Sequence, residues 1–365
     1  MPWLDQLFAK MTEMGASDMH ITSQHIPMIR NSGDLVPVPW LDTKLNASQV
    51  KRILNEITPE TNWQEFEESG DTDFAYALEG VGRFRANLFM DRYGPGGVFR
   101  LIPEKILTAE QLGLPSTVLN LTNFHKGLIL VTGPTGSGKS TTLAAMLDYL
   151  NERRCEHILT IEDPIEFVHP PKRCLVNQRE VHKHTDSFAK ALRAALREDP
   201  DIVLVGEMRD LETTRIAIET AETGHLVFGT LHTTTAASTV DRVINQFPAD
   251  EQEQIRLMLS TSLRGVIAQN LLKKKGGGRC AALEILVVTP GISAMIREGK
   301  TYQLESSMQT GAKFGMQLLN DALERLILDD KVEPAEALDR SADKEDMAKR
   351  FQTLGIPMPE PSGAH

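Results

Sequence analysis

The chain has 365 residues, of which 41% are hydrophobic and 24% charged, a composition typical of a globular protein with room for two domains. Its 39 lysines and arginines against 50 aspartates and glutamates leave a formal charge of −11, which argues against a nucleic-acid partner. No run of 18 apolar residues occurs and charges interrupt the first twenty residues, so we expect neither membrane insertion nor a signal peptide.

Residues 1–102 predict a small α+β domain of short strands with a few helices. The expected helices cover 3–14 and 48–68, and the expected strands cover 19–22, 27–33, 34–40, 72–78, 82–89 and 96–102. Residues 103–124 contain two prolines in a polar setting and are predicted to connect this domain to the next.

Residues 125–350 predict an α/β nucleotide-binding core, because long apolar strands alternate with helices. The expected strands cover 127–133, 157–163, 201–207 and 225–232, and the expected helices cover 139–152, 186–198 and 210–222. Residues 235–350 are expected to be mainly helical, with the basic run Lys273–Lys275 in a solvated turn, and residues 351–365 to form a disordered tail.

The three cysteines, Cys155, Cys174 and Cys280, are widely spaced. They are too few for a four-cysteine zinc site, and they suggest reduced thiols in a cytosolic protein. We expect them to be small buried side chains.

A phosphate-binding loop is predicted between the first strand and the first helix of the core. The stretch GPTGSGKST matches G-x-x-x-x-G-K-[ST], and it comprises Gly133, Pro134, Thr135, Gly136, Ser137, Gly138, Lys139, Ser140 and Thr141. Its backbone N–H groups suit a β-phosphate, Lys139 suits the β- and γ-phosphates, and the Ser140 hydroxyl suits Mg²⁺. No N-K-x-D guanine motif is apparent, so ATP is the expected nucleotide.

Acidic residues end two of the apolar strands. Glu162 and Asp163 follow one strand, and Glu207 follows another in DIVLVGE, where Gly206 stands at the usual position of a magnesium-binding aspartate. This departure assigns the catalytic base to Glu207 and leaves the metal role to Glu162 or Asp163, directly or through water. Charges at strand ends can be purely structural, but parallel sheets place their ligands at these ends.

His225 and His232 bracket the last strand of the core. Seven residues apart on an extended strand, they point to opposite faces and cannot share one metal. His232, at the carboxyl end, is a candidate sensor of the γ-phosphate. In the first domain, Arg83 and Arg85 share one face of a strand, with Arg100 as a further candidate. They either form a solvated face or act in a ring of subunits, where the arginines of one subunit contact the nucleotide phosphate bound to its neighbour.

Four ordered motifs resemble those of the type II/IV secretion ATPase superfamily. GPTGSGKST, TIEDPIEFVH (160–169), DPDIVLVGEMRD (199–210) and AETGHLVFGTLHT (221–233) look like its Walker A motif, Asp box, Walker B motif and His box. SDMHIT (17–22) and GRFRAN (82–87) look like its PAS-like N-terminal domain. The resemblance implies a RecA-like P-loop core with a C-terminal helical subdomain, behind a PAS-like domain.

Within the superfamily the chain is similar to the PilT-type retraction ATPases of type IV pili. Its first domain is short, the C-x-x-C zinc segment of extension and secretion enzymes is absent, and GISAMIRE (291–298) resembles the family signature AIRNLIRE. Four of those eight positions depart from the signature, which leaves a PilU-like accessory ATPase open. An amphipathic helix alone would also explain the octapeptide.

The resemblance implies a cytoplasmic, Mg²⁺-dependent homo-hexameric ATPase at the pilus base, peripheral to the inner membrane, that acts on a membrane platform protein. A paralogous ATPase is a further implied partner. Glu207 would activate water, Glu162 and Asp163 would assist Mg²⁺, the two histidines would couple subunits, and the arginines would reach nucleotide. Three alternatives stay open: a regulatory ring component with little hydrolysis, an assembly or secretion ATPase, and a DNA translocase, which the acidic charge disfavours.

Overall fold

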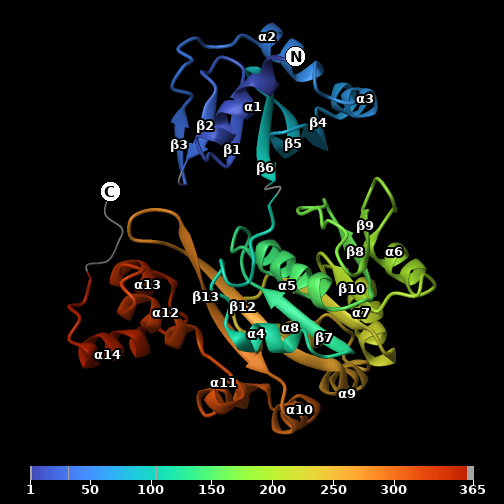
Figure 1. Cartoon of the computed structure of the whole chain (residues 1–365), viewed down its shortest axis with the longest axis vertical. Coiled ribbons are helices and arrows are strands. Elements are labelled where there is room, and N and C mark those ends of the chain that lie inside the picture. The colour runs from blue at the N-terminus through green and yellow to red at the C-terminus, as the bar shows by residue number, and fades with distance from the viewer. Residues whose placement is uncertain (1, 32, 103–104, 360–365) are drawn as a thin grey trace. The chain divides into compact units, whose positions relative to one another are not determined.

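The chain divides into two compact units, Met1–Lys105 and Ile106–His365, as seen in a computed structural model that describes residues 2–31, 33–102 and 105–359 (Figure 1). The segment predicted to connect the domains, 103–124, lies partly outside the described residues. Its remainder contains α4 (Ser116–Leu121), and Val118 and Leu121 of this helix are buried in the second unit. Among the described residues, no helix combines the length and the apolar character that crossing a bilayer requires.

The first unit is built on an antiparallel sheet of six strands in the order β3-β2-β1-β6-β5-β4. The strands are β1 (Asp18–Thr22), β2 (Met28–Asn31), β3 (Asp34–Pro37), β4 (Asp71–Leu78), β5 (Gly82–Asp91) and β6 (Gly94–Ile102). The helices are α1 (Trp3–Glu13), α2 (Ala47–Asn55) and α3 (Glu60–Ser69). The small α+β domain predicted from the sequence is confirmed.

One face of this sheet is apolar and packs on α1. The ring of Phe8 lies 4.2 Å from that of Phe84 and 5.1 Å from that of Phe99, measured between ring centres. Because strand side chains alternate, Arg83 and Arg85 of β5 lie on the opposite face from Phe84.

The helix expected over 48–68 is wrong as a single element, because the structure has two helices there. Asn46 caps α2 by accepting a hydrogen bond from Gln49 N at 2.9 Å. Pro59 precedes the first residue of α3, a position where its missing N–H costs nothing. The proline that starts the second helix cannot lie inside the first.

The second unit is built on a seven-stranded sheet in the order β13-β12-β7-β11-β10-β8-β9. The strands are β7 (Gly127–Thr132), β8 (His157–Glu162), β9 (Leu175–Glu180), β10 (Ile202–Val205), β11 (Leu226–Leu231), β12 (Leu263–Lys273) and β13 (Arg279–Val287). All neighbouring strands are parallel except β12 and β13. Every residue of β7, β10 and β11 is buried, which confirms the predicted parallel core.

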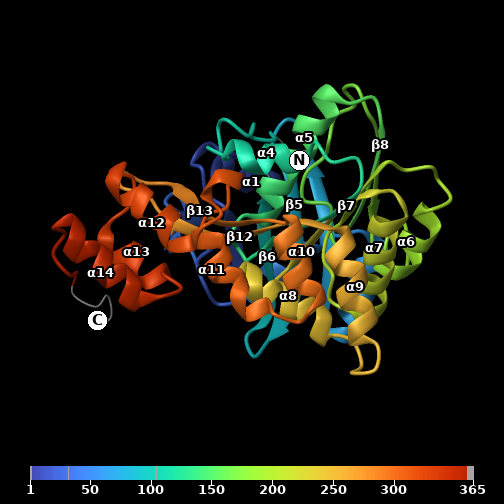
Figure 2. The ribbon, with the colours of Figure 1, turned by 90° about the horizontal axis from the view of Figure 1, so that it is seen from below.

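Helices cover both faces of this sheet (Figures 1 and 2). On one face lie α4 and α5 (Lys139–Arg153). The other face is covered by α6 (Phe188–Ala195), α7 (Leu211–Thr223), α8 (Ala236–Asn245), α9 (Gln252–Ser262), α10 (Pro290–Arg297) and α11 (Leu304–Gln309). Two short 3-10 helices, Thr301–Gln303 and Ala312–Phe314, flank α11.

The hairpin β12–β13 was not predicted, because residues 235–350 were expected to be mainly helical. Its turn contains the basic run Lys273–Lys275 and three glycines with positive φ, and all of these residues are exposed, which confirms the solvated turn. Where β12 meets β7, the register shifts between Leu263 and Gly265.

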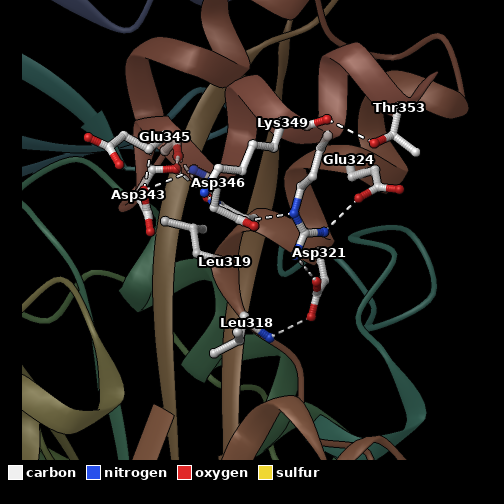
Figure 3. Close-up of polar contacts among 12 residues, drawn as sticks. Leu318, Leu319, Asp321, Glu324, Asp343, Glu345, Asp346, Lys349 and Thr353 are labelled. Atoms are coloured by element: carbon white, nitrogen blue, oxygen red, sulfur yellow. Dashed lines mark hydrogen bonds and ion pairs between the residues drawn. The ribbon is translucent and has the colours of Figure 1, made fainter. Parts of the chain in front are cut away.

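Three C-terminal helices pack on the hairpin: α12 (Leu319–Leu328), α13 (Pro334–Arg340) and α14 (Lys344–Leu354). Arg350 of α14 joins two of them, because its guanidinium lies 2.9 Å from Asp321 and 2.6 Å from Glu324, both in α12 (Figure 3). The tail predicted from residue 351 begins too early, since Phe351 is fully buried in α14. Residues 360–365 lie outside the described residues.

Candidate functional site

The loop that the sequence predicts to bind phosphate lies between β7 and α5, which is the predicted position. Gly138 caps the helix with φ +87°, a left-handed conformation that glycine adopts without a steric penalty. The Lys139 ammonium donates to the carbonyl oxygens of Gly133 at 2.8 Å and Pro134 at 3.2 Å. The first N–H groups of α5 have no carbonyl one turn earlier, so this helix end favours an anion.

Burial lowers the pKa of Lys139, and the nearby carboxylates of Glu207 and Glu166 oppose that shift. The ammonium is therefore partly desolvated, and the negative charges of Glu207 and Glu166 stabilise its charged form. Glu166 belongs to the acidic box TIEDPIEFVH, in which no sequence pattern distinguishes it from its acidic neighbours.

Glu207 follows β10 and makes two short contacts with basic side chains. Its Oε1 lies 2.7 Å from His232 Nε2 and 2.5 Å from Arg209 Nε. Burial would raise the pKa of Glu207, but hydrogen bonds from Arg209 and His232 outweigh it, so the net pKa is lowered. Glu207 is thus a carboxylate at neutral pH, as a base must be. Arg209 was missed because an exposed arginine after a strand has no distinguishing pattern.

Glu162 ends β8, and its carboxyl group is largely enclosed. Oε1 accepts hydrogen bonds from Thr160 Oγ1 at 2.6 Å and Gln178 Nε2 at 3.2 Å, and burial raises its pKa. Asp163, the next residue, is exposed. Of the two predicted metal-binding candidates, Glu162 has the more enclosed position.

Gly206 stands at the predicted position of a magnesium-binding aspartate and lies close to the end of β8. A Cβ at this position would lie 3.0 Å from the Ile161 carbonyl oxygen and 3.2 Å from Glu162 Cα. The end of β8 therefore crowds the place of a side chain at 206. Glu162, from the neighbouring strand, brings a carboxylate to the same neighbourhood.

A cavity of about 30 Å³ lies beside Ser140, and its lining includes Glu162, Gly206, Thr230 and His169. A hydroxyl and a carboxylate facing one small space are the hard oxygen donors that Mg²⁺ prefers, so these residues fit the implied ion. Among the described residues, no group of three His, Cys, Asp or Glu side chains could hold a metal alone. A magnesium ion here would draw its other ligands from nucleotide and water.

His169 lies in this lining with 8% of its surface exposed, and its Nδ1 is buried with no hydrogen-bond partner in the described structure. Burial lowers the pKa of His169 to about 4, so the imidazole is neutral at pH 7. The sequence could have indicated it only as the last residue of the acidic box.

The two predicted histidines lie at opposite ends of β11. His232 lies beside Glu207, whereas His225 Nδ1 lies 3.1 Å from the Thr220 carbonyl oxygen of α7. The expectation that they cannot share a metal agrees with this placement. The structure brings His232, and not His225, to the end of the sheet that holds the phosphate loop.

The candidate arginines belong to the first unit. Arg100 Nε lies 2.8 Å from Asp18 Oδ1, and Arg85 Nε lies 3.8 Å from Asp73 Oδ1. Arg85 and Arg100 are directly opposite each other on β5 and β6, and Arg83 is two residues before Arg85. The three side chains therefore follow one face of the small sheet.

Gln269 of β12 contacts the phosphate loop, and the sequence did not predict it. Its Nε2 donates to Ser137 O at 2.7 Å, and its Oε1 accepts from Thr142 Oγ1 at 2.7 Å. Gln269 and Ser137 are 132 residues apart, and the strand that carries Gln269 was not predicted. No local sequence pattern therefore indicates this contact.

The chain resembles known proteins over most of its length. The sequence model of the family described as "Type II/IV secretion system protein" matches residues 1–327. The "Type IV pilus retractation ATPase PilT" of Pseudomonas aeruginosa is 55% identical over 326 residues, covering 89% of this chain and 94% of that protein. The "Type IV pilus ATPase PilU" of the same organism is 38% identical, covering 92% and 87%.

A solved structure agrees with the sequence comparison. The crystal structure of the pilus retraction motor PilT with bound ADP is 45% identical, covers 95% of this chain and 99% of its own, and superposes with a TM-score of 0.86.

Proposed function

The chain belongs to the family of type II/IV secretion system proteins, and from this premise we propose that it is the Mg²⁺-dependent ATPase that drives retraction of type IV pili. The observation that carries the proposal is the Glu207–His232 pair at 2.7 Å, at the carboxyl end of the sheet that also holds the phosphate loop. The greater identity to the PilT relative than to the PilU relative favours the main retraction motor over an accessory one.

In this proposal the phosphate loop binds ATP through its backbone N–H groups and Lys139. Ser140, with Glu162 facing the same cavity, holds Mg²⁺, which supplies charge neutralisation at the phosphates. Glu207 accepts a proton from the attacking water, because its lowered pKa keeps it ionised. Protonation removes the negative charge of Glu207, and this weakens its electrostatic attraction to His232.

The mechanical part of the proposal rests on the relatives. We infer a cytoplasmic homo-hexamer at the pilus base, which acts on an inner-membrane platform protein and works beside a paralogous ATPase. Arg83, Arg85 and Arg100 reach nucleotide in this assembly. His225 lies far from the loop of its own subunit, so a role at nucleotide would be at a subunit interface. A few kcal/mol of nucleotide-dependent energy suffices to switch such an arrangement.

Two measurements test the proposal. Purified protein with Mg²⁺ should hydrolyse ATP, and Lys139→Ala should not, whereas the exposed-site variant Lys126→Ala should retain the parental rate. Absence of turnover in the parent would favour a regulatory ring component. Deletion of the gene should give hyperpiliated cells that do not twitch, and bald cells would identify an assembly ATPase instead.

A further inference from the structure

Gln269 is a buried amide enclosed by the phosphate loop and the helix that follows it. Only 3% of its surface is exposed, and both ends of its amide are used. Nε2 donates to the Ser137 carbonyl oxygen, and Oε1 accepts from the Thr142 hydroxyl. One side chain therefore joins the loop to the first turn of α5.

The loop also packs closely on this strand. A Cβ on Gly133 would lie 2.3 Å from the Gln269 carbonyl oxygen, and a Cβ on Gly138 would lie 2.8 Å from Gln269 Nε2. The contact with a backbone oxygen requires a glycine at 133, whereas a Cβ at 138 would displace the Gln269 amide. Gly136, by contrast, has nothing within 4 Å of such an atom.

The bond to Ser137 fixes the direction of a peptide group. In a trans peptide the C=O of one residue and the N–H of the next point to opposite sides. A Ser137 carbonyl that points at Gln269 therefore turns the Gly138 N–H away from Gln269. Phosphate loops bind phosphate with N–H groups of this kind.

We propose that Gln269 is a positioning residue for nucleotide binding, which holds the Ser137–Gly138 peptide and α5 in the conformation that accepts the β-phosphate. The inference rests on the nucleotide-binding part of the proposed function and is independent of pilus retraction. It predicts that the contribution of Gln269 appears in nucleotide affinity as well as in stability.

The test compares Gln269→Leu with Gln317→Leu. Gln317 is a matched control, because its Nε2 also donates to a backbone carbonyl, Leu283 O at 2.8 Å, in the same unit. The dissociation constant for ADP and the melting temperature are measured for both variants. Gln269→Leu should weaken ADP binding about tenfold, which is about 1.4 kcal/mol, because the Ser137 carbonyl loses its buried donor and the Ser137–Gly138 peptide is no longer held. Gln317→Leu should change ADP affinity less than about twofold whatever its melting temperature.

Two further variants keep the test decisive if Gln269→Leu does not fold. Gln269→Glu retains the acceptor for Thr142 but loses the donor to Ser137, so it should weaken ADP binding as strongly as leucine. Thr142→Val removes only the other contact and should have the smaller effect. The inference is overturned if a folded Gln269 variant binds ADP within twofold of the parent, or if Gln317→Leu loses as much affinity. A parent that binds ADP without hydrolysing ATP would contradict the proposed function alone.

Discussion

His232 Nε2 lies 2.7 Å from Glu207 Oε1, which joins the carboxyl ends of the neighbouring strands β10 and β11. The two residues are 25 positions apart in the chain, and the parallel register of the strands brings them together. A change of charge at Glu207 therefore alters the electrostatic energy of His232 directly.

Glu207→Gln should reduce ATP turnover by about 10²–10⁴-fold, because an amide cannot accept the proton from water. The affinity for ADP should stay near that of the parent, since the phosphate loop is untouched. Steady-state turnover and ADP titration check the two parts. Glu212→Gln, an exposed carboxylate on α7, is the control and should turn over normally. Turnover of Glu207→Gln within tenfold of the parent would remove Glu207 from the base role.

Arg209→Ala should move the acid limb of the pH–rate profile to higher pH. Arg209 donates to Glu207 and lowers its pKa, so without it the carboxylate takes up a proton at higher pH and activity is lost earlier on acidification. The shift is modest because Arg209 is 72% exposed and solvent screens it. Arg193→Ala, which removes a similarly exposed partner of Glu212, should leave the profile in place.

Gly133→Ala should abolish ADP binding, whereas Gly136→Ala should weaken it only modestly. Both glycines have positive φ, 143° at Gly133 and 77° at Gly136, which an alanine adopts only with strain. Only at Gly133 does the added methyl also meet a backbone oxygen at 2.3 Å, which cannot move without shifting β12. Titration of ADP into both variants checks the difference. Equal losses would mean that conformation and not close packing sets the requirement.

His169 should make the second unit less stable as the pH falls from about 6.5 to 4. Its folded pKa of about 4 lies below the ordinary value, so in this interval the unfolded chain binds a proton that the folded chain does not. The loss is about 3 kcal/mol. His169→Phe should remove this part of the pH dependence in denaturant unfolding at pH 7 and pH 4.5. His125→Phe, at a position with 86% exposure, should retain it. An unchanged pH dependence in His169→Phe would contradict the lowered pKa.

The parallel core and the phosphate loop were predictable because their signals are local. The strand runs before Gly133, Glu162 and Glu207 are mostly apolar, and the loop pattern stands between a strand and a helix. A parallel sheet then places the following residues at one edge, so Glu207 and His232 could be expected together.

The β12–β13 hairpin and its contacts could not be predicted from local sequence patterns. Runs such as GVIAQNLL are apolar at several successive positions, a pattern that a buried helix and a buried strand share. The three glycines after Lys275 predict a solvated turn, but a turn alone does not show that strands flank it. Gln269 bonds to Ser137, and His169 lines the same cavity as Ser140 and Thr230. These neighbours are distant in the sequence, and only the assembled sheet brings them together.

The shift of register between Leu263 and Gly265 decides which side chains of β12 meet the phosphate loop. Side chains alternate along a strand, so Ile267 and Gln269 face α5 while Val266 faces the opposite helices. Loss or gain of one residue at that irregularity would exchange the two sets and place Gln269 on the wrong side. Chimeras that graft C-terminal helices from one relative onto another should therefore be joined in the exposed turn at 274–278. A junction upstream would have to preserve chain length to the residue.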